Sequence, residues 1–305
     1  MEFFDGLKDK NGVVKICAPM VRYSKLPFRL LVREFGCDLA FSPMIMAESF
    51  AVSEKARLNE FTTNKNDRPL IVQFASNEVG QFVESAKIVS NSCDGVDLNC
   101  GCPQGWALKE GIGACLIDKP DFVSDLVRQT RNQTRDDLLV SVKIRIHSDY
   151  KKTIELCRQV EKAGVHFISV HGRTKSQRSH PVNFEAIKNI KQSVQVPVVA
   201  NGDIKTLDDV KSVKEATNID GVMAARGLLE NPAFFAGHEL TPKECVQSWL
   251  RIALDDATPF PCFHHHLSYM LEKSLPRPER KYLNSFNSTP AAIDYLEERF
   301  GITYN

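Results

Sequence analysis

Short runs rich in Val, Ile and Leu alternate with longer amphipathic stretches over the first 225 or so residues. The runs have the length and β-branched composition of buried strands, and the stretches between them have helical periodicity. This alternation is typical of a parallel sheet whose strands are joined by helices. The predicted strands are Val13–Cys17, Leu39–Phe41, Leu70–Phe74, Gly95–Asn99, Leu139–Ile144, Phe167–Val170, Val196–Ala200 and Gly221–Ala225.

The stretches between these runs predict helices, and their ends carry the expected signals. Thr206 stands three residues before Asp209, which resembles a capping box, and Gly36 and Gly164 follow helix ends. Eight βα units favour a (β/α)8 TIM barrel, because a doubly wound sheet usually stops at five or six strands. The predicted helices include Phe28–Phe35, Val79–Val89, Phe122–Asn132, Thr153–Ala163, Phe184–Ile190 and Leu207–Glu215.

The alternation stops after Ala225-Arg226-Gly227, and the remaining sequence reads as helices interrupted by prolines. We therefore predict an α/β protein with two domains, a TIM-barrel catalytic domain at 1–238 and a small all-helical domain at 239–305. The helical part is close to neutral, so contact with a nucleic acid would need a patch such as Arg277, Arg280 and Lys281. His264-His265-His266 has apolar neighbours there, which favours burial over a metal site.

The composition is that of an ordinary globular enzyme, with 43% hydrophobic residues and 39 Lys+Arg against 38 Asp+Glu. No run approaches the roughly 20 apolar residues of a membrane span, and residues 1–12 lack the apolar core of a signal peptide. Nine cysteines, an odd number spread over the chain, favour reduced thiols over a disulfide framework. We expect an intracellular monomer without membrane contact, in the cytoplasm, with the nucleus as the alternative.

Polar residues follow seven of the eight predicted strands. In a TIM barrel the carboxyl ends of the strands form the mouth that holds the active site. A structural rim alone would not select so many polar groups, so the mouth is predicted to be functional. The residues that converge there are Gln73, Asn99, Cys102, Lys143, His171, Asn201 and Arg226.

The loops after the last two predicted strands suit a phosphate group. In Asn201-Gly202-Asp203 and Ala225-Arg226-Gly227, glycines let backbone N–H groups come close and Arg226 adds charge. Lys143 and the amide of Gln73 suit the electron-rich edge of a flavin. FMN is favoured over FAD or NAD, because no G-x-G-x-x-G sequence follows a strand.

The glycine-rich loop after the fourth predicted strand holds Cys102, with Cys100 and Cys115 nearby. No metal site is predicted, because C-x-C followed by a single Cys is not a common zinc spacing. A thiol at the mouth is a usable general acid, which makes Cys102 the candidate catalytic residue. In contrast, Cys17, Cys93 and Cys157 are predicted to be inert buried thiols.

These motifs occur together and in order in one family. The sequence resembles the tRNA-dihydrouridine synthases, flavoenzymes that reduce particular uridines in the D-loop of tRNA, over nearly the whole chain. Within the family it looks most like the eukaryotic subclass that acts on positions 20a and 20b. The matching motifs are Ala18-Pro19-Met20 through Arg29, Asp97–Pro103, Gly111–Ala114, Val142–Arg145, His171–Thr174, Asn201–Ile204 and Arg226–Pro232.

The resemblance implies that NAD(P)H reduces a bound FMN and that a hydride passes from flavin N5 to C6 of the uracil. Cys102 would give a proton to C5, Asn99 would contact the uracil, and the helical domain would grip the tRNA. The residues implied to hold FMN are Pro19, Met20, Val21, Gln73, Lys143, His171, Asn201, Gly202, Asp203, Ala225 and Arg226.

Segment 143–180 holds nine Lys/Arg against three Asp/Glu, and Arg145, Arg173 and Arg178 are candidates for contacts with tRNA phosphates. Two alternative functions stay open. One is an FMN barrel that acts on a free pyrimidine, which would not need a helical domain. The other is an RNA-binding barrel without catalysis, which would not need Lys143 and Cys102.

Overall fold

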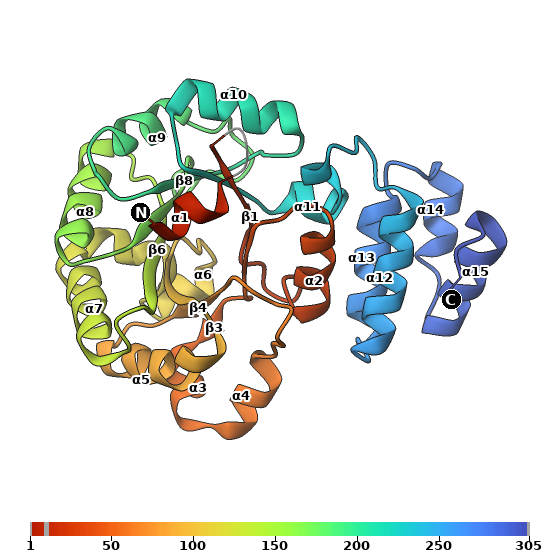
Figure 1. The fold of residues 1–305 in the computed structure, drawn as a ribbon, viewed down its shortest axis with the longest axis horizontal. Helices are drawn as coiled ribbons and strands as arrows, with labels where there is room; N and C mark the ends of the chain where they lie inside the picture. Colours follow the sequence, from red (N-terminus) through yellow and green to blue (C-terminus); the bar gives the residue numbers. More distant parts are fainter. Residues whose placement is uncertain (1, 9–11, 304–305) are drawn as a thin grey trace.

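The computed structural model describes residues 2–8 and 12–303; Met1, residues 9–11 of the charged N-terminal segment and residues 304–305 lie outside the description. One parallel sheet closes on itself, because β2 pairs with both β1 and β4. The predicted (β/α)8 barrel is therefore confirmed (Figure 1). The strands are β1 Val14–Cys17, β2 Leu39–Phe41, β3 Ile45–Met46, β4 Leu70–Ala75, β5 Gly95–Cys100, β6 Leu139–Arg145, β7 Phe167–His171, β8 Val198–Asn201 and β9 Gly221–Ala224.

All eight predicted strands are present, with ends that differ by at most two residues. Strands β4 to β8 each run one residue further toward the mouth than predicted. In β6, β7 and β8 the added residue is polar, and the ladder continues through it, for example in the pairing of His171 with Asn201. The short β3 was not predicted. It pairs with β4 and is separated from β2 by residues 42–44. This segment contains Pro43, which has no N–H to donate to a ladder.

The predicted helices are all present, and Thr206 and Asp209 form the expected capping box. Figure 1 shows them as a ring around the strands. Helix α2 starts two residues early, because Pro27 is tolerated in a first turn, where its missing N–H has no partner to lose. Around the barrel lie α2 Leu26–Glu34, α3 Ala47–Val52, α4 Glu54–Glu60, α5 Val79–Val89, α6 Gly105–Lys109, α7 Pro120–Gln133, α8 Tyr150–Lys162, α9 Phe184–Lys191, α10 Leu207–Thr217 and α11 Arg226–Glu230.

Helix α1, Glu2–Leu7, packs against the amino end of the barrel. Its buried Phe4 lies with its ring centroid 5.0 Å from that of Phe167, the first residue of β7. Phe167 in turn lies 6.3 Å from Phe41 of β2. Aromatic packing thus fills the end of the barrel opposite the predicted mouth.

Beyond α11 the described residues form four α-helices, and Figure 1 shows the first two of them beside α2 and α11 and the last two farther from the barrel. Trp249 is fully buried, and His266 stacks on Phe28 of α2 with a centroid distance of 4.5 Å. The predicted burial is confirmed for His264 and His266, whereas His265 is exposed. Both parts share one apolar core, and the boundary at 238/239 stays a prediction. The helices are α12 Lys243–Asp255, α13 Phe260–Leu271, α14 Arg277–Leu283 and α15 Thr289–Phe300.

Three short 3-10 helices complete the structure: η1 Ser90–Ser92, η2 Gly113–Asp118 and η3 Phe234–Ala236. In the described part of the chain, no helix has both the length and the apolar character needed to cross a membrane.

Candidate active site

The inner face of the barrel becomes polar toward the mouth. Side chains alternate between the two faces of a strand, so residues two apart share the inner face. Strand register then sets polar residues side by side in layers. Gln73, Asp97 and Ser141 form one layer, Asn99, Lys143 and Ser169 the next, and His171 and Asn201 pair above them.

A chain of hydrogen bonds links these layers to the loop after β5. Asp97 accepts from Ser141 Oγ at 2.6 Å and from Gln73 Nε2 at 2.8 Å. Gln73 Oε1 accepts from Asn99 Nδ2 at 2.8 Å, and Asn99 Oδ1 accepts from the backbone N–H of Cys102 at 2.8 Å. Asp97 therefore orients the Gln73 amide, and Asn99 holds the loop that carries Cys102.

Sequence reasoning did not single out Asp97, although its place two residues before Asn99 on the same strand was a usable signal. Burial raises the pKa of Asp97 to about 6, while hydrogen bonds from Ser141 and Gln73 act in the opposite direction. A carboxylate in this position carries a desolvation cost, and the network around it lowers that cost.

Lys143 crosses the mouth from β6 to β8, where its Nζ donates to Asn201 Oδ1 at 3.0 Å. Asn201 Nδ2 donates to the carbonyl of Met223 at 2.8 Å, which fixes the orientation of that amide. Burial lowers the pKa of Lys143 to about 8, with a further contribution from Arg145. Lys143 is thus mostly cationic at neutral pH, and it is the central positive charge of the mouth.

His171 lies beside this cation and is neutral. Burial lowers its pKa to about 2, and the cations Lys143, Arg145, Arg173 and Arg226 act in the same direction. Its imidazole can donate or accept a hydrogen bond to a bound ligand but supplies no charge.

A hollow of about 190 Å³ opens over the ends of β8 and β9. Gly202 has φ +129°, and a Cβ there would lie 2.7 Å from Val182. Asp203 forms ion pairs with both Arg173 and Arg226, the latter at 2.8 Å. These groups make a cationic end that suits a phosphate. The lining includes Pro19, Lys143, His171, Arg173, Asn201, Gly202, Asp203, Lys205, Ala225, Arg226 and Gly227.

A second hollow of about 160 Å³ adjoins the first, since Pro19, Lys143 and His171 line both. Cys102 is partly exposed there, whereas Cys100 is fully buried and burial raises its pKa well above the ordinary value. The second hollow therefore offers one accessible thiol from this pair. Its lining is Pro19, Val21, Met44, Gln73, Asn99, Gly101, Cys102, Lys143, Arg145 and His171.

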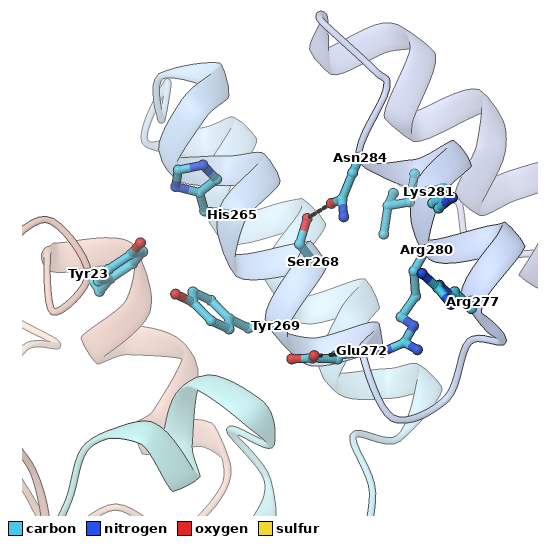
Figure 2. Close-up of a pocket in the computed structure, with 10 residues that line it drawn as sticks. Tyr23, His265, Ser268, Tyr269, Glu272, Arg277, Arg280, Lys281 and Asn284 are labelled. Carbon is cyan, nitrogen blue, oxygen red and sulfur yellow. Dashed lines mark hydrogen bonds and ion pairs between the residues drawn. The ribbon is translucent and has the colours of Figure 1, made fainter. Parts of the chain in front are cut away.

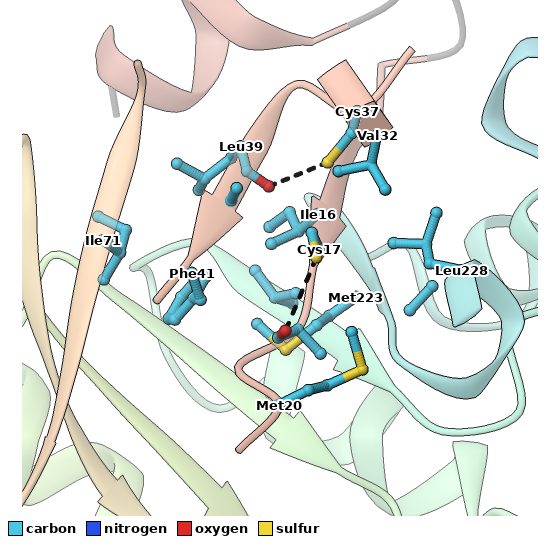
Figure 3. Packing of buried hydrophobic residues seen from close by; sticks show 14 of the residues in the cluster. Ile16, Cys17, Met20, Val32, Cys37, Leu39, Phe41, Ile71, Met223 and Leu228 are labelled. Atoms are coloured by element: carbon cyan, nitrogen blue, oxygen red, sulfur yellow. Dashed lines mark hydrogen bonds between the residues drawn. The ribbon is translucent and has the colours of Figure 1, made fainter. Parts of the chain in front are cut away.

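The structure thus brings most of the residues predicted to hold FMN to one mouth. Met20 differs, because its side chain is buried in the apolar cluster of Figure 3 and it lines neither hollow. Figure 3 also shows Cys17 and Cys37 in this cluster. The predicted burial of Cys17, Cys93 and Cys157 is confirmed, and burial raises the pKa of the last two to about 12.

The three arginines predicted to contact tRNA differ in their surroundings. A tRNA contact by Arg173 stays a prediction that its surroundings argue against, because its side chain is 2% exposed and paired with Asp203 at the cationic hollow. Arg145 is half-buried and donates to the carbonyls of Gly101, Thr174 and Gln177. Arg178 is exposed and remains a candidate for RNA contact.

Among the described residues, no group of three or more His, Cys, Asp or Glu side chains could hold a metal ion. The polar groups of the mouth include amides, lysines, arginines, a histidine, a thiol and the carboxylates of Asp97 and Asp203. This set suits an organic ligand with a phosphate.

A model of the dihydrouridine synthase (Dus) family matches residues 16–293, which include the barrel strands and most of the C-terminal helices. The chain belongs to the dihydrouridine synthase family. The match also covers both hollows and the chain of hydrogen bonds that ends at Cys102.

Named relatives within this family align along most of the chain. A Homo sapiens protein named a tRNA-dihydrouridine(20a/20b) synthase-like protein, with NAD(P)+ in its name, is 54% identical over 95% of this chain and 92% of its own length. A Schizosaccharomyces pombe tRNA-dihydrouridine(20a/20b) synthase is 44% identical over 98% of this chain and 91% of its own length.

Solved structures of low identity share the fold. The old yellow enzyme from Trypanosoma cruzi superposes with a TM-score of 0.54 at 12% identity, over 72% of this chain and 85% of that one. An old yellow enzyme homologue from Zymomonas mobilis gives 0.53 at 10% identity, over 82% and 91%. At these identities the likeness supports the barrel fold alone.

Proposed function

We propose that the protein is a flavin-dependent tRNA-dihydrouridine synthase that reduces D-loop uridines to 5,6-dihydrouridine with NAD(P)H. Membership of the family and the names of relatives that align over most of both chains support the reaction and the tRNA substrate. The observation that carries the proposal is the pair of adjoining hollows, one cationic and glycine-bounded, the other with an accessible thiol.

FMN is the flavin that fits this site. Its phosphate would lie by Gly202 and Arg226, with Asp203 holding that arginine in place. Gln73, Lys143 and His171 would face the ring system, and a cation there favours the negative charge that a reduced flavin carries near N1. When bound, FMN would supply the hydride that adds to C6 of the uracil.

Cys102 would supply the proton that C5 of the uracil requires. Its backbone N–H is held by Asn99, and its carbonyl accepts from the N–H of Ala114 at 2.9 Å, so the thiol has a fixed position at the mouth. Asn99 already uses its carbonyl oxygen twice and one amide hydrogen toward Gln73. It can therefore give one hydrogen bond to a carbonyl of the uracil.

A uridine must leave its stack to reach this mouth, which favours an unpaired loop nucleotide. The tRNA would extend from the mouth, past exposed Arg178, toward the helical domain and its cations on α14. A free pyrimidine would use the mouth alone.

The test is to release the ligand of the purified protein by heat, determine its mass, and then map dihydrouridine after incubation with FMN, NADPH and unmodified tRNA. We expect FMN and new dihydrouridine in the D-loop. Release of FAD, or no flavin after reconstitution, would overturn the cofactor assignment. Equal reduction of free uridine and tRNA would favour the free-pyrimidine alternative, and flavin with no reduction of either would overturn the reaction.

A further inference from the structure

A groove of about 510 Å³ lies outside the mouth, between the barrel and the helical domain. Its floor is one face of α13, where His265, Ser268 and Tyr269 recur at helical spacing, and Glu272 follows directly after the end of that helix. Figure 2 shows Tyr23, from the β1–α2 loop, on one side of α13. Helix α14 and its cations lie on the other side. The groove therefore has an aromatic side toward the barrel and a cationic side away from it.

The aromatic side is held in place by the barrel. Tyr23 and Tyr269 lie nearly perpendicular, with ring centroids 5.6 Å apart. The loop of Tyr23 is fixed because Ser24 Oγ accepts from the N–H of Met20 at 2.9 Å. The buried Arg29, ion-paired with Asp67, donates to the carbonyl of Ser24 at 2.7 Å. Tyr23 thus sits on a fixed loop and forms a preformed aromatic wall.

The cationic side is tied to the same floor. His264 of α13 is hydrogen-bonded to the carbonyl of Leu283 on α14 at 2.8 Å, and Ser268 Oγ donates to Asn284 Oδ1 at 2.9 Å. Three cations line this side, Arg277, Arg280 and Lys281, and the acid in the groove is Glu272, 3.6 Å from Arg280. Positive charge is concentrated here, although residues 241–305 hold seven Lys/Arg against eight Asp/Glu.

We propose that this groove receives one unstacked nucleotide of the tRNA, other than the uridine in the mouth. Its base would pack against Tyr23 and Tyr269, and its phosphates would face Arg277 and Lys281. Aromatic side chains beside cations are the combination that binds single-stranded nucleotides. The inference rests on the proposed function, because it needs tRNA as the substrate.

The groove is also close enough to the mouth for one strand to reach both. Val21 lines the hollow of Cys102, and Tyr23 follows it by two residues, which span at most about 7 Å of chain. A neighbouring nucleotide of a D-loop with one uridine in the mouth is therefore within reach of the groove.

The test measures tRNA binding by the FMN-loaded protein and the rate of dihydrouridine formation. Tyr269→Ala is expected to raise the Kd for tRNA by about 5- to 150-fold, the range for loss of one stacked base, and to raise KM while kcat is kept. Tyr269→Phe should bind like the wild type. The control is Tyr282→Ala, since Tyr282 is exposed on α14 but does not line the groove. Melting curves of all three variants verify folding.

A double-mutant cycle identifies the occupant. tRNAs with a single abasic nucleotide at each position beside the target uridine are bound to the wild type and to Tyr269→Ala. One abasic position is expected to weaken the wild type and to add no loss in Tyr269→Ala. The proposal would be overturned if Tyr269→Ala bound tRNA as tightly as the wild type. It would also be overturned if the loss of affinity from every abasic position added in full to the loss from Tyr269→Ala.

The cationic side has its own matched pair. Arg277→Gln should make the plot of log K against log salt shallower, with the magnitude of its slope reduced by about 0.7, the value for one single-strand phosphate contact. Arg299→Gln should leave the slope unchanged, because Arg299 is on α15, pairs with Glu279 and does not line the groove. Equal slopes for both variants would contradict the phosphate contact. Binding is read without turnover, so failure of catalysis and failure of the groove are distinguished.

Discussion

Cys100 and Cys102 are two residues apart and have opposite environments. Cys100 is the last residue of β5 and is fully buried, whereas Cys102 is partly exposed in the second hollow. We predict that Cys102→Ala keeps FMN and tRNA binding but loses about 10²- to 10⁴-fold in the rate of reduction, the usual contribution of a general acid. Cys100→Ala should keep the rate. Single-turnover kinetics with saturating tRNA checks both, and a slow Cys100→Ala beside a fast Cys102→Ala would reverse the assignment.

Asp97 links pH to stability through its burial. Its pKa is about 6 in the folded protein against 3.8 for the free side chain, so the folded state holds the proton more tightly. This tighter binding of the proton adds about 3 kcal/mol to the free energy of unfolding. The full contribution is present below pH 3.8, and it is lost as the pH rises through about 6. We predict that Asp97→Asn removes this dependence, so melting temperatures between pH 4 and 7 fall less steeply than in the wild type.

The same substitution should weaken flavin binding. An amide in place of the carboxylate sets a donor against Gln73 Nε2, so the Gln73 amide would turn over or lose its bond. Flavin fluorescence titration measures this loss of affinity. Asp125→Asn, at a half-exposed carboxylate of α7, is the control for both measurements. A variant with wild-type pH dependence and wild-type flavin affinity would contradict the role given to Asp97.

At the scale of elements, the hydrophobic pattern predicted the barrel because its strands are buried on both sides and read as apolar runs. It missed the last residue of several strands, because a polar side chain such as Asn201 or His171 ends the apolar run while the backbone ladder continues. It also missed α4, which buries no residue and so leaves no apolar stripe.

The site was less predictable where pairing across the sequence decides the role of a residue. Arg173 reads as an exposed cation until Asp203, thirty residues later in the chain, is seen to pair with it. Asp97 reads as part of a strand until Gln73 and Ser141 are set beside it by register. Local patterns carry no information about such partners.

Helix α11 and the loop after β8 meet without space for a side chain. A Cβ on Gly227 would lie 2.3 Å from the carbonyl oxygen of Ile204. That oxygen belongs to the backbone, so no side-chain rotation can relieve the overlap. We predict that Gly227→Ala separates the two phosphate-side loops, costs about 1–3 kcal/mol of stability and weakens FMN binding. Thermal unfolding with and without FMN measures both effects.

The control for this prediction is Gly80→Ala. Gly80 lies in the first turn of α5, where the nearest atom to an added Cβ is 3.8 Å away. Alanine is the better helix former, so this variant should be stabilised by up to about 1 kcal/mol with unchanged FMN affinity. Full FMN affinity in Gly227→Ala would contradict the close packing of the two loops as a requirement for the flavin site.

At the scale of the whole molecule, a net charge of +1 gives little general attraction for tRNA. Attraction must come from local surfaces, and segment 143–180 holds nine Lys/Arg against three Asp/Glu. The structure divides that excess. Lys143 and Arg173 are turned into the mouth, whereas Arg178 is exposed.

Arg173 and Arg178 lie in one loop, so a matched pair of variants separates flavin binding from tRNA binding. Arg178→Gln should weaken tRNA binding and reduce the magnitude of the slope of log K against log salt by about 0.7 to 0.9. The FMN content of this variant should stay full. Arg173→Gln leaves Asp203 without one of its two cations, so FMN content should fall while the slope is kept. Binding of tRNA at several salt concentrations, beside the flavin content of each preparation, gives both quantities. An unchanged slope in Arg178→Gln would remove that arginine from the RNA contacts, and a lowered slope in Arg173→Gln with full FMN would restore the contact that its burial argues against.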